Sequence, residues 1–399
     1  MSEFDAASQP QYASFQNEIY ALGVDGHAPK LPIGAQELQR RARERLGEEA
    51  YGYVAGGAGS ELTMAANVSA FERWQIVPRM LRDVSERDLR TTVLGTAMPA
   101  PLLLAPVGVQ SIVHPEGELA TGRAAAALGL PAILSTASSN TLEDVAGEME
   151  PARPGSRWFQ LYWPRDRELA ASFVSRAGAA GYEAIVVTLD TWLLGWRPRD
   201  LANGYLPFLK GEGVANYFAD PVFRAALPQP PEEDPGPAIA HWAYNFANPR
   251  VTWEDLAWLR EQTSLPIVLK GILHPEDARR ALAAGVQGVI VSNHGGRQVD
   301  GSIGALDALP DVRAAVGAQF AVLFDSGIRT GADIFKALAL GADAVCVGRP
   351  YVWGLGLDGQ AGVEHVLRCL LAELDLTLAL SGCTTIAHVD GSALRRAEP

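Results

Sequence analysis

Two residues that could carry acid–base and anion-binding chemistry, His294 and Arg297, stand on either side of two glycines in the segment 292–298. The apolar, β-branched run 288–291 directly before them is typical of a buried strand. An imidazole can accept a proton near neutral pH, and a guanidinium binds a carboxylate through a rigid pair of donors. Their position at the exit of a strand indicates a site suited to oxidising a small acid. The alternative is a turn with a purely structural histidine.

The elements that must position this segment form a repeating pattern from about Pro101 onward, in which short apolar runs alternate with helix-like segments. Most of the apolar runs lack polar alternation, as expected for strands covered on both faces. Eight strands are predicted, at residues 101–107, 131–136, 157–163, 184–190, 266–272, 288–292, 321–326 and 344–348. Eight such strands predict an α/β fold, a closed TIM (β/α)8 barrel. A doubly wound sheet is the alternative, but no Gly-x-Gly-x-x-Gly turn follows the first strand.

Segments rich in Ala, Leu, Glu and Arg lie between these strands and are expected to be helices. They cover residues 117–128, 166–180, 252–262, 275–284, 305–316 and 331–340. Several end at a glycine, which is a common helix stop. These stops are Gly129, Gly181, Gly285 and Gly341.

Two segments stand outside the repeat. Residues 1–100 are expected to form an N-terminal helical segment packed on a (β/α)8 barrel domain of residues 101–399. Residues 191–250 form a long insertion after strand four, with a proline-rich middle at 228–235 between aromatic patches. Because long loops are usually functional or disordered, we expect a mobile middle and ordered flanks that fold over the barrel mouth. A passive insertion or an oligomer contact is the alternative.

Composition narrows the class of protein. Hydrophobic residues make up 48% of the 399 residues and charged residues 20%, which predicts a globular enzyme with a sizeable core. The net charge of −13 argues against nucleic acid or an anionic membrane as a partner. The three cysteines show no metal-ligand spacing, residues 1–5 do not resemble a secretory signal, and no apolar run is long enough to span a membrane. A cytoplasmic protein without a metal is therefore expected.

Polar and charged residues gather at the carboxyl ends of the predicted strands, where barrel active sites lie. They are Gln160, Tyr162, Thr188, Asp190, Lys270, Ser292, His294 and Asp325. We expect Asp190 to orient His294 and to stabilise its imidazolium form. Lys270 could balance negative charge developing on a cofactor, and a lysine that merely reaches solvent is the alternative.

The loops after strands seven and eight, with Gly327, Arg329, Gly348 and Arg349, predict a phosphate site, because glycine amides and arginines bind phosphate there. His114 and His274 each precede Pro-Glu and are expected to cap helices. The other histidines suggest no ligand set.

Seven motifs together closely resemble the FMN-dependent 2-hydroxy acid oxidising family, which includes glycolate oxidase, lactate oxidase, flavocytochrome b2 and lactate monooxygenase. The motifs are residues 53–58, 105–106, 159–162, 188–191, 269–271, 292–298 and 325–329. The resemblance covers nearly the whole chain, from about Leu46 to the C-terminal helix. It implies FMN as cofactor and a homo-oligomer, tetramer or octamer, that acts on a small 2-hydroxy acid and O2.

Carried over by position, the resemblance also implies roles for single residues. FMN contacts would come from Ala105, Ser135, Gln160, Thr188, Lys270, Ser292, Asp325, Gly327, Arg329, Gly348 and Arg349. Tyr53, Arg197 and Arg297 would bind the substrate carboxylate and Tyr162 would bind near the reacting hydroxyl. His294 would be the catalytic base, supported by Asp190, and Lys270 would act on the cofactor.

Within the family, the sequence of residues 195–201 and the long insertion after strand four most resemble lactate 2-monooxygenase. That branch implies the conversion of L-lactate and O2 to acetate, CO2 and water, because a covering loop could retain pyruvate while O2 reoxidises FMN. Val107 departs from glycolate oxidase, which has a hydroxyl-bearing residue there. The alternatives are an oxidase that releases a 2-oxo acid and H2O2 and, from another class, a non-catalytic flavin-binding scaffold.

Overall fold

The structure is a computed structural model that describes residues 11–150 and 155–397. Residues 1–5, on which the prediction of no secretory signal depends, lie outside the described residues. In the described part, no helix combines the length and apolarity needed to cross a bilayer.

Eight parallel strands close into one barrel, in which each strand pairs with its neighbours in chain order and the last returns to the first. The strands are β4 (Leu102–Leu104), β5 (Ala132–Ser135), β6 (Arg157–Leu161), β7 (Ile185–Thr188), β8 (Ile267–Ile272), β9 (Gly288–Val291), β10 (Ala321–Phe324) and β11 (Ala344–Val347). All eight predicted strands are confirmed, and closure excludes the doubly wound alternative. Most observed strands end one to three residues before the predicted carboxyl end, because the final residues leave the ladder to line a cavity.

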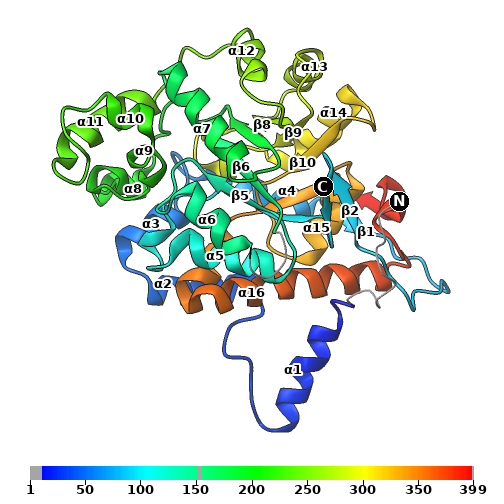
Figure 1. Cartoon of the computed structure of the whole chain (residues 1–399). Coiled ribbons are helices and arrows are strands. Elements are labelled where there is room, and N and C mark those ends of the chain that lie inside the picture. The colour runs from blue at the N-terminus through cyan, green and yellow to red at the C-terminus, as the bar shows by residue number, and fades with distance from the viewer. Residues whose placement is uncertain (1–10, 151–154, 398–399) are drawn as a thin grey trace.

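The predicted helices surround the barrel (Figure 1). They are α5 (Gly117–Ala127), α7 (Arg167–Ala179), α12 (Asp255–Glu261), α13 (Pro275–Ala283), α14 (Ala305–Val316) and α15 (Gly331–Ala339). The glycine stops after α5, α7, α13 and α15 all have φ between 66° and 110°, a left-handed conformation that glycine adopts easily. His274 accepts the Glu276 N–H at 3.1 Å and caps α13 as predicted.

One helix of the barrel, α6 (Leu142–Met149), escaped prediction, and the bounds of the C-terminal helix, which the resemblance implied, come only from the structure. The short helix α6 follows β5, and its Thr141 hydroxyl accepts the Asp144 N–H, a capping signal visible in the sequence. The long helix α16 (Arg349–Leu380) follows β11 and runs across the base of the molecule in Figure 1.

The N-terminal region is helical only as far as Glu72. It contains α1 (Ser14–Val24), α2 (Ala35–Arg45), α3 (Glu48–Ala55), α4 (Leu62–Glu72), β1 (Trp74–Ile76), β2 (Thr91–Val93) and β3 (Thr96–Met98). β1 pairs with β12 (Leu394–Arg396), so the N-terminal region contacts the C-terminal end of the described chain. The β2–β3 hairpin packs Val93 and Met98 into the barrel core. The division into segments 1–100 and 101–399 stays a prediction.

The insertion between β7 and β8 is mainly helical and lies to one side of the barrel in Figure 1. It contains α8 (Pro198–Ala202), the 3-10 helix η2 (Pro207–Lys210), α9 (Ala215–Phe218), α10 (Pro221–Ala225) and α11 (Pro235–Phe246). Pro235 does not belong to a loop but starts α11, where a missing N–H costs nothing and Asp234 caps the helix. The buried aromatic residues Phe208, Tyr217 and Trp242 belong to the same hydrophobic core as the barrel and its helices, so the insertion packs directly on the barrel.

Candidate active site

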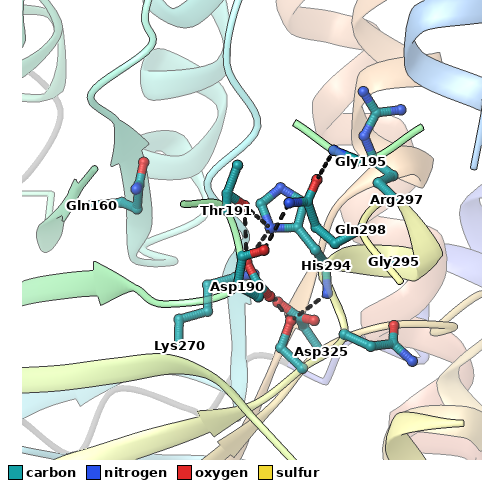
Figure 2. A network of polar contacts seen from close by, with 12 residues as sticks. Gln160, Asp190, Thr191, Gly195, Lys270, His294, Gly295, Arg297, Gln298 and Asp325 are labelled. Carbon is teal, nitrogen blue, oxygen red and sulfur yellow. Dashed lines mark hydrogen bonds and ion pairs between the residues drawn. The ribbon is translucent and has the colours of Figure 1, made fainter. Parts of the chain in front are cut away.

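The predicted pair of His294 and Asp190 meets at the carboxyl end of the barrel (Figure 2). His294 Nδ1 lies 2.7 Å from Asp190 Oδ1, and the Thr191 hydroxyl donates to the same carboxylate oxygen at 3.0 Å. Burial alone would raise the pKa of Asp190, but His294 and Lys270 lower it to about 2. Asp190 therefore stays ionised and accepts a hydrogen bond from the Nδ1–H of His294, which leaves Nε2 free to accept a proton.

His294 itself has an unusual backbone, with φ of 58° in the 3-10 helix η3 (His294–Gly296). The adjacent glycines are required here: a Cβ on Gly296 would lie 2.5 Å from the Met64 backbone nitrogen. Burial lowers the pKa of His294 although Asp190 opposes this shift, so the imidazole is neutral near pH 7. A neutral imidazole is the form that a general base needs.

Lys270 lies inside the barrel, 3% exposed, which excludes a lysine that reaches solvent. Its ammonium donates to the Ser292 hydroxyl at 3.0 Å and lies 3.2 Å from Asp325 Oδ2. Burial opposes the charge, but Asp325 and Asp190 outweigh it and raise the pKa of Lys270. The site therefore holds a fixed positive charge at its floor.

Two arginines and two tyrosines form the other side of the site. Burial and the nearby Arg197 lower the pKa of Arg297 to about 10, so it remains charged without a carboxylate partner in the described chain. Its guanidinium lies 5.0 Å from the centre of the Tyr53 ring. Burial also raises the pKa of Tyr162 to about 12, so its hydroxyl stays a donor. Together these side chains form a site for an anion.

Gln298, the last residue of the segment 292–298, connects the insertion to the barrel through hydrogen bonds. Its amide nitrogen donates to the backbone oxygens of Asp190 and Leu193 at 2.7 and 2.9 Å, and its amide oxygen accepts from Arg197 at 2.7 Å. The sequence analysis assigned no role to Gln298, because nothing in its local context reveals partners about 100 residues away.

The predicted phosphate loops lie side by side at the ends of β10 and β11. Burial lowers the pKa of both Arg329 and Arg349, and no ion pair holds either one within the described residues. Arg349 also donates to the backbone oxygens of Val54, Gly56 and Gly295 at 2.9–3.0 Å. It thus joins the N-terminal region to the loop after β9 while it faces the phosphate region.

Buried polar atoms that lack a hydrogen-bond partner show whether these residues fit FMN. Gln160 Nε2 and Thr188 Oγ1 are buried and have no hydrogen-bond partner among the described residues, although Gln160 Oε1 accepts from Ser135 at 2.9 Å. Buried polar groups are normally paired. These two groups are joined in the site by Arg329 and Arg349, which form no ion pair among the described residues. Together they fit a ligand that has a polar ring and a phosphate.

One cavity brings most predicted site residues together. Those that line it are Tyr53, Ala105, Ser135, Tyr162, Arg197, Lys270, His294, Arg297, Asp325, Gly327, Arg329, Gly348 and Arg349. Asp190, Gln160, Thr188 and Ser292 lie just behind this lining. The insertion adds Leu194, Phe208 and Phe246, which the sequence analysis did not assign to the site. No group of three or more metal-ligating side chains occurs in the described chain.

This fold and site define the class of (β/α)8 flavin-dependent oxidoreductases, and comparisons with known proteins agree. A family model described as "FMN-dependent dehydrogenase" matches residues 42–396. An L-lactate oxidase of Lysinibacillus sphaericus is 48% identical over 92% of this chain and 94% of its own, and human 2-hydroxyacid oxidase 1 is 42% identical over 92% and 97%. A crystal structure of mandelate oxidase with (S)-4-hydroxymandelic acid superposes with a TM-score of 0.81 at 41% identity, over 92% of this chain and all of the other.

The chain therefore belongs to the FMN-dependent dehydrogenase family. It is an oxidoreductase of the FMN-dependent 2-hydroxy acid oxidase and dehydrogenase group, and its cofactor is FMN.

Proposed function

We propose that this protein oxidises a small L-2-hydroxy acid, with L-lactate as the first candidate, and that His294 is the catalytic base. The observation that carries the proposal is that His294, held by Asp190 at 2.7 Å, lines one cavity with Arg297, which forms no ion pair within the described residues. A base and an anion site that line the same cavity match the hydroxyl and the carboxylate of one small substrate.

In this proposal each side chain handles a stated part of the substrate. Arg297, Arg197 and Tyr53 bind the carboxylate, and Tyr162 donates to the hydroxyl oxygen. His294 Nε2 takes the hydroxyl proton, and Asp190 stabilises the imidazolium that results. FMN, when bound, would accept the two electrons together with the hydrogen on the substrate's C2, which leaves a 2-oxo acid. Lys270 places its ammonium near the acceptor and so offsets the negative charge that arrives.

The residues proposed to hold FMN follow the same cavity. Gln160, Thr188, Ser135 and Ala105 would contact the ring system, with Lys270, Ser292 and Asp325 at its polar edge. Arg329, Arg349, Gly327 and Gly348 would bind the phosphate. The unpaired amide of Gln160 and the uncompensated arginines support this assignment.

For the fate of the product, we propose a monooxygenase outcome in which L-lactate and O2 give acetate, CO2 and water. The support comes from the insertion, which contributes Leu194, Phe208 and Phe246 to the cavity lining and stacks Phe208 on Trp242 at 4.8 Å between ring centres. A wall of packed rings would retain pyruvate long enough for hydrogen peroxide to decarboxylate it. A homo-oligomer and a cytoplasmic location also remain proposals.

The second candidate is an oxidase that releases a 2-oxo acid and H2O2. The relatives favour it, because they include L-lactate oxidases and a 2-hydroxyacid oxidase. The scaffold alternative predicts that L-lactate never reduces the bound flavin.

Product analysis separates these candidates. Purified holoenzyme is given L-lactate in air without catalase, and acetate, pyruvate and peroxide are measured. Acetate without free peroxide supports the monooxygenase, whereas equal amounts of pyruvate and peroxide identify the oxidase. If L-lactate, glycolate and L-mandelate all leave the flavin oxidised under anaerobic conditions, 2-hydroxy acid oxidation itself is wrong for this protein.

A further inference from the structure

The loop 105–109 forms one wall of the cofactor cavity and has a constrained backbone. Ala105, Val107 and Gly108 line the cavity, and Val109 has a φ of 57°, which a β-branched residue adopts rarely. A Cβ on Gly108 would lie 2.4 Å from the Ala137 oxygen, so the loop backbone touches the neighbouring strand exit directly. Such a conformation persists only where its surroundings hold it.

Two buried side chains hold this loop from the side opposite the cavity. Tyr351, 1% exposed in the first turn of α16, donates its hydroxyl to the Ala105 oxygen at 2.9 Å. Gln110 Nε2 donates to the Val107 oxygen at 2.9 Å and to the Tyr351 hydroxyl at 3.3 Å. The backbone carbonyl groups of Ala105 and Val107, on either side of Pro106, therefore both accept hydrogen bonds from this pair of connected side chains.

A third buried residue, Glu118 at the start of α5, holds Gln110 in turn. Its Oε1 accepts the Gln110 N–H at 3.0 Å, and the Thr121 hydroxyl donates to the Gln110 side-chain oxygen. Glu118 is 2% exposed, and burial raises its pKa to about 7 although the Gln110 amide opposes the shift. No cation pairs with it in the described chain, and its Oε2 has no hydrogen-bond partner there. A buried carboxyl group without a cation partner is unfavourable. Its presence here indicates that the hydrogen bond to Gln110 is needed.

We propose that Tyr351, with Gln110 and Glu118 behind it, is a positioning residue that sets the loop 105–109 against FMN. None of the three side chains lines the cofactor cavity; all three line a second, small cavity on the other side of the loop. They act on the cofactor only through the backbone that they hold. The inference depends on FMN as cofactor and is independent of which 2-hydroxy acid is oxidised.

The test compares two tyrosines that differ mainly in what their hydroxyl groups bind. Tyr182 is also buried and lines the second cavity, but its hydroxyl donates to the Leu142 oxygen at 2.8 Å, away from the loop. FMN release is measured by diluting each holoenzyme and following the fluorescence of free FMN. Tyr351→Phe should raise the FMN dissociation constant about three- to tenfold, as expected for the loss of a buried hydrogen bond. Tyr182→Phe should change it less than twofold.

A second readout and a second pair of variants guard against a general loss of stability. The absorption spectrum of bound FMN should change in Tyr351→Phe and not in Tyr182→Phe, while KM for the 2-hydroxy acid stays unchanged in both. Glu118→Gln keeps an oxygen for the Gln110 N–H and should retain FMN like the wild type, whereas Glu118→Leu should lose it more readily. Equal FMN release from Tyr351→Phe and Tyr182→Phe overturns the proposal, as does wild-type retention of FMN and an unchanged spectrum in Tyr351→Phe. Neither result bears on the proposed substrate.

Discussion

The carboxyl ends of the barrel strands and the insertion 191–250 build the same cavity by different means. The strand ends contribute buried charges held by short hydrogen bonds, such as His294 with Asp190 and Lys270 with Ser292. The insertion contributes one cation, Arg197, and a wall of packed rings that includes Phe208 and Phe246. The difference suggests a division of labour in which the barrel performs the chemistry and the insertion decides what enters and stays.

The largest expected effect belongs to the barrel. His294→Gln should retain FMN but reduce the flavin roughly 10²–10⁴-fold more slowly, as is typical for loss of a general base. Anaerobic stopped-flow absorbance with L-lactate measures this rate, and the FMN content of the purified variant is the control. Reduction at a near-normal rate would remove His294 from its proposed role.

Arg297→Met should lower kcat/KM about 10- to 100-fold, because a charge-assisted hydrogen bond to the carboxylate contributes roughly 1.5–3 kcal/mol. Both KM and the rate of flavin reduction should suffer, since the same contact binds and orients the substrate. Unchanged anaerobic kinetics would contradict the assignment. Lys30→Met, a change of an exposed cation far from the cavity, is a suitable control.

The pH dependence of kcat/KM should follow His294. Only the neutral imidazole accepts a proton, so the rate should fall about tenfold for each pH unit below the His294 pKa and level off above it. Burial lowers that pKa, so the midpoint of the acid limb should lie below the ordinary value for histidine. A midpoint clearly above 6.5 would show that the imidazolium is stabilised more than burial allows.

The smallest effect is expected from the insertion, and it should change selectivity rather than rate. Phe246→Leu should raise the ratio of kcat/KM for L-mandelate to that for L-lactate about three- to tenfold, because it opens the ring wall beside Tyr162. Free peroxide should increase as well. Tyr244→Leu, on the same helix but 63% exposed, should change neither. If Phe246→Leu leaves both selectivity and peroxide unchanged, the insertion does not have the proposed role.

Much of the site could be predicted because barrel chemistry is local to the strand ends. Lys270 stands at the end of one continuous apolar run and His294 shortly after another, so the sequence alone placed both at the carboxyl ends of barrel strands. Gln298 and Phe246 could not be assigned in this way. Gln298 bonds to atoms about 100 residues away, and Phe246 ends a helix that the proline-rich composition of the insertion concealed.

The sequence by itself determined the barrel, its eight strands and the types of reactive side chain at their ends, because strand propensity, helix stops and apolar runs are local properties. The sequence also predicted that Asp190 supports His294, but only the tertiary structure decided how closely these two side chains meet and which other side chains meet. Barrel closure brings Asp190 within 2.7 Å of His294, and the start of α16 brings the Tyr351 hydroxyl to Ala105. Contacts over such separations depend on how whole elements pack, which no local pattern of residues encodes.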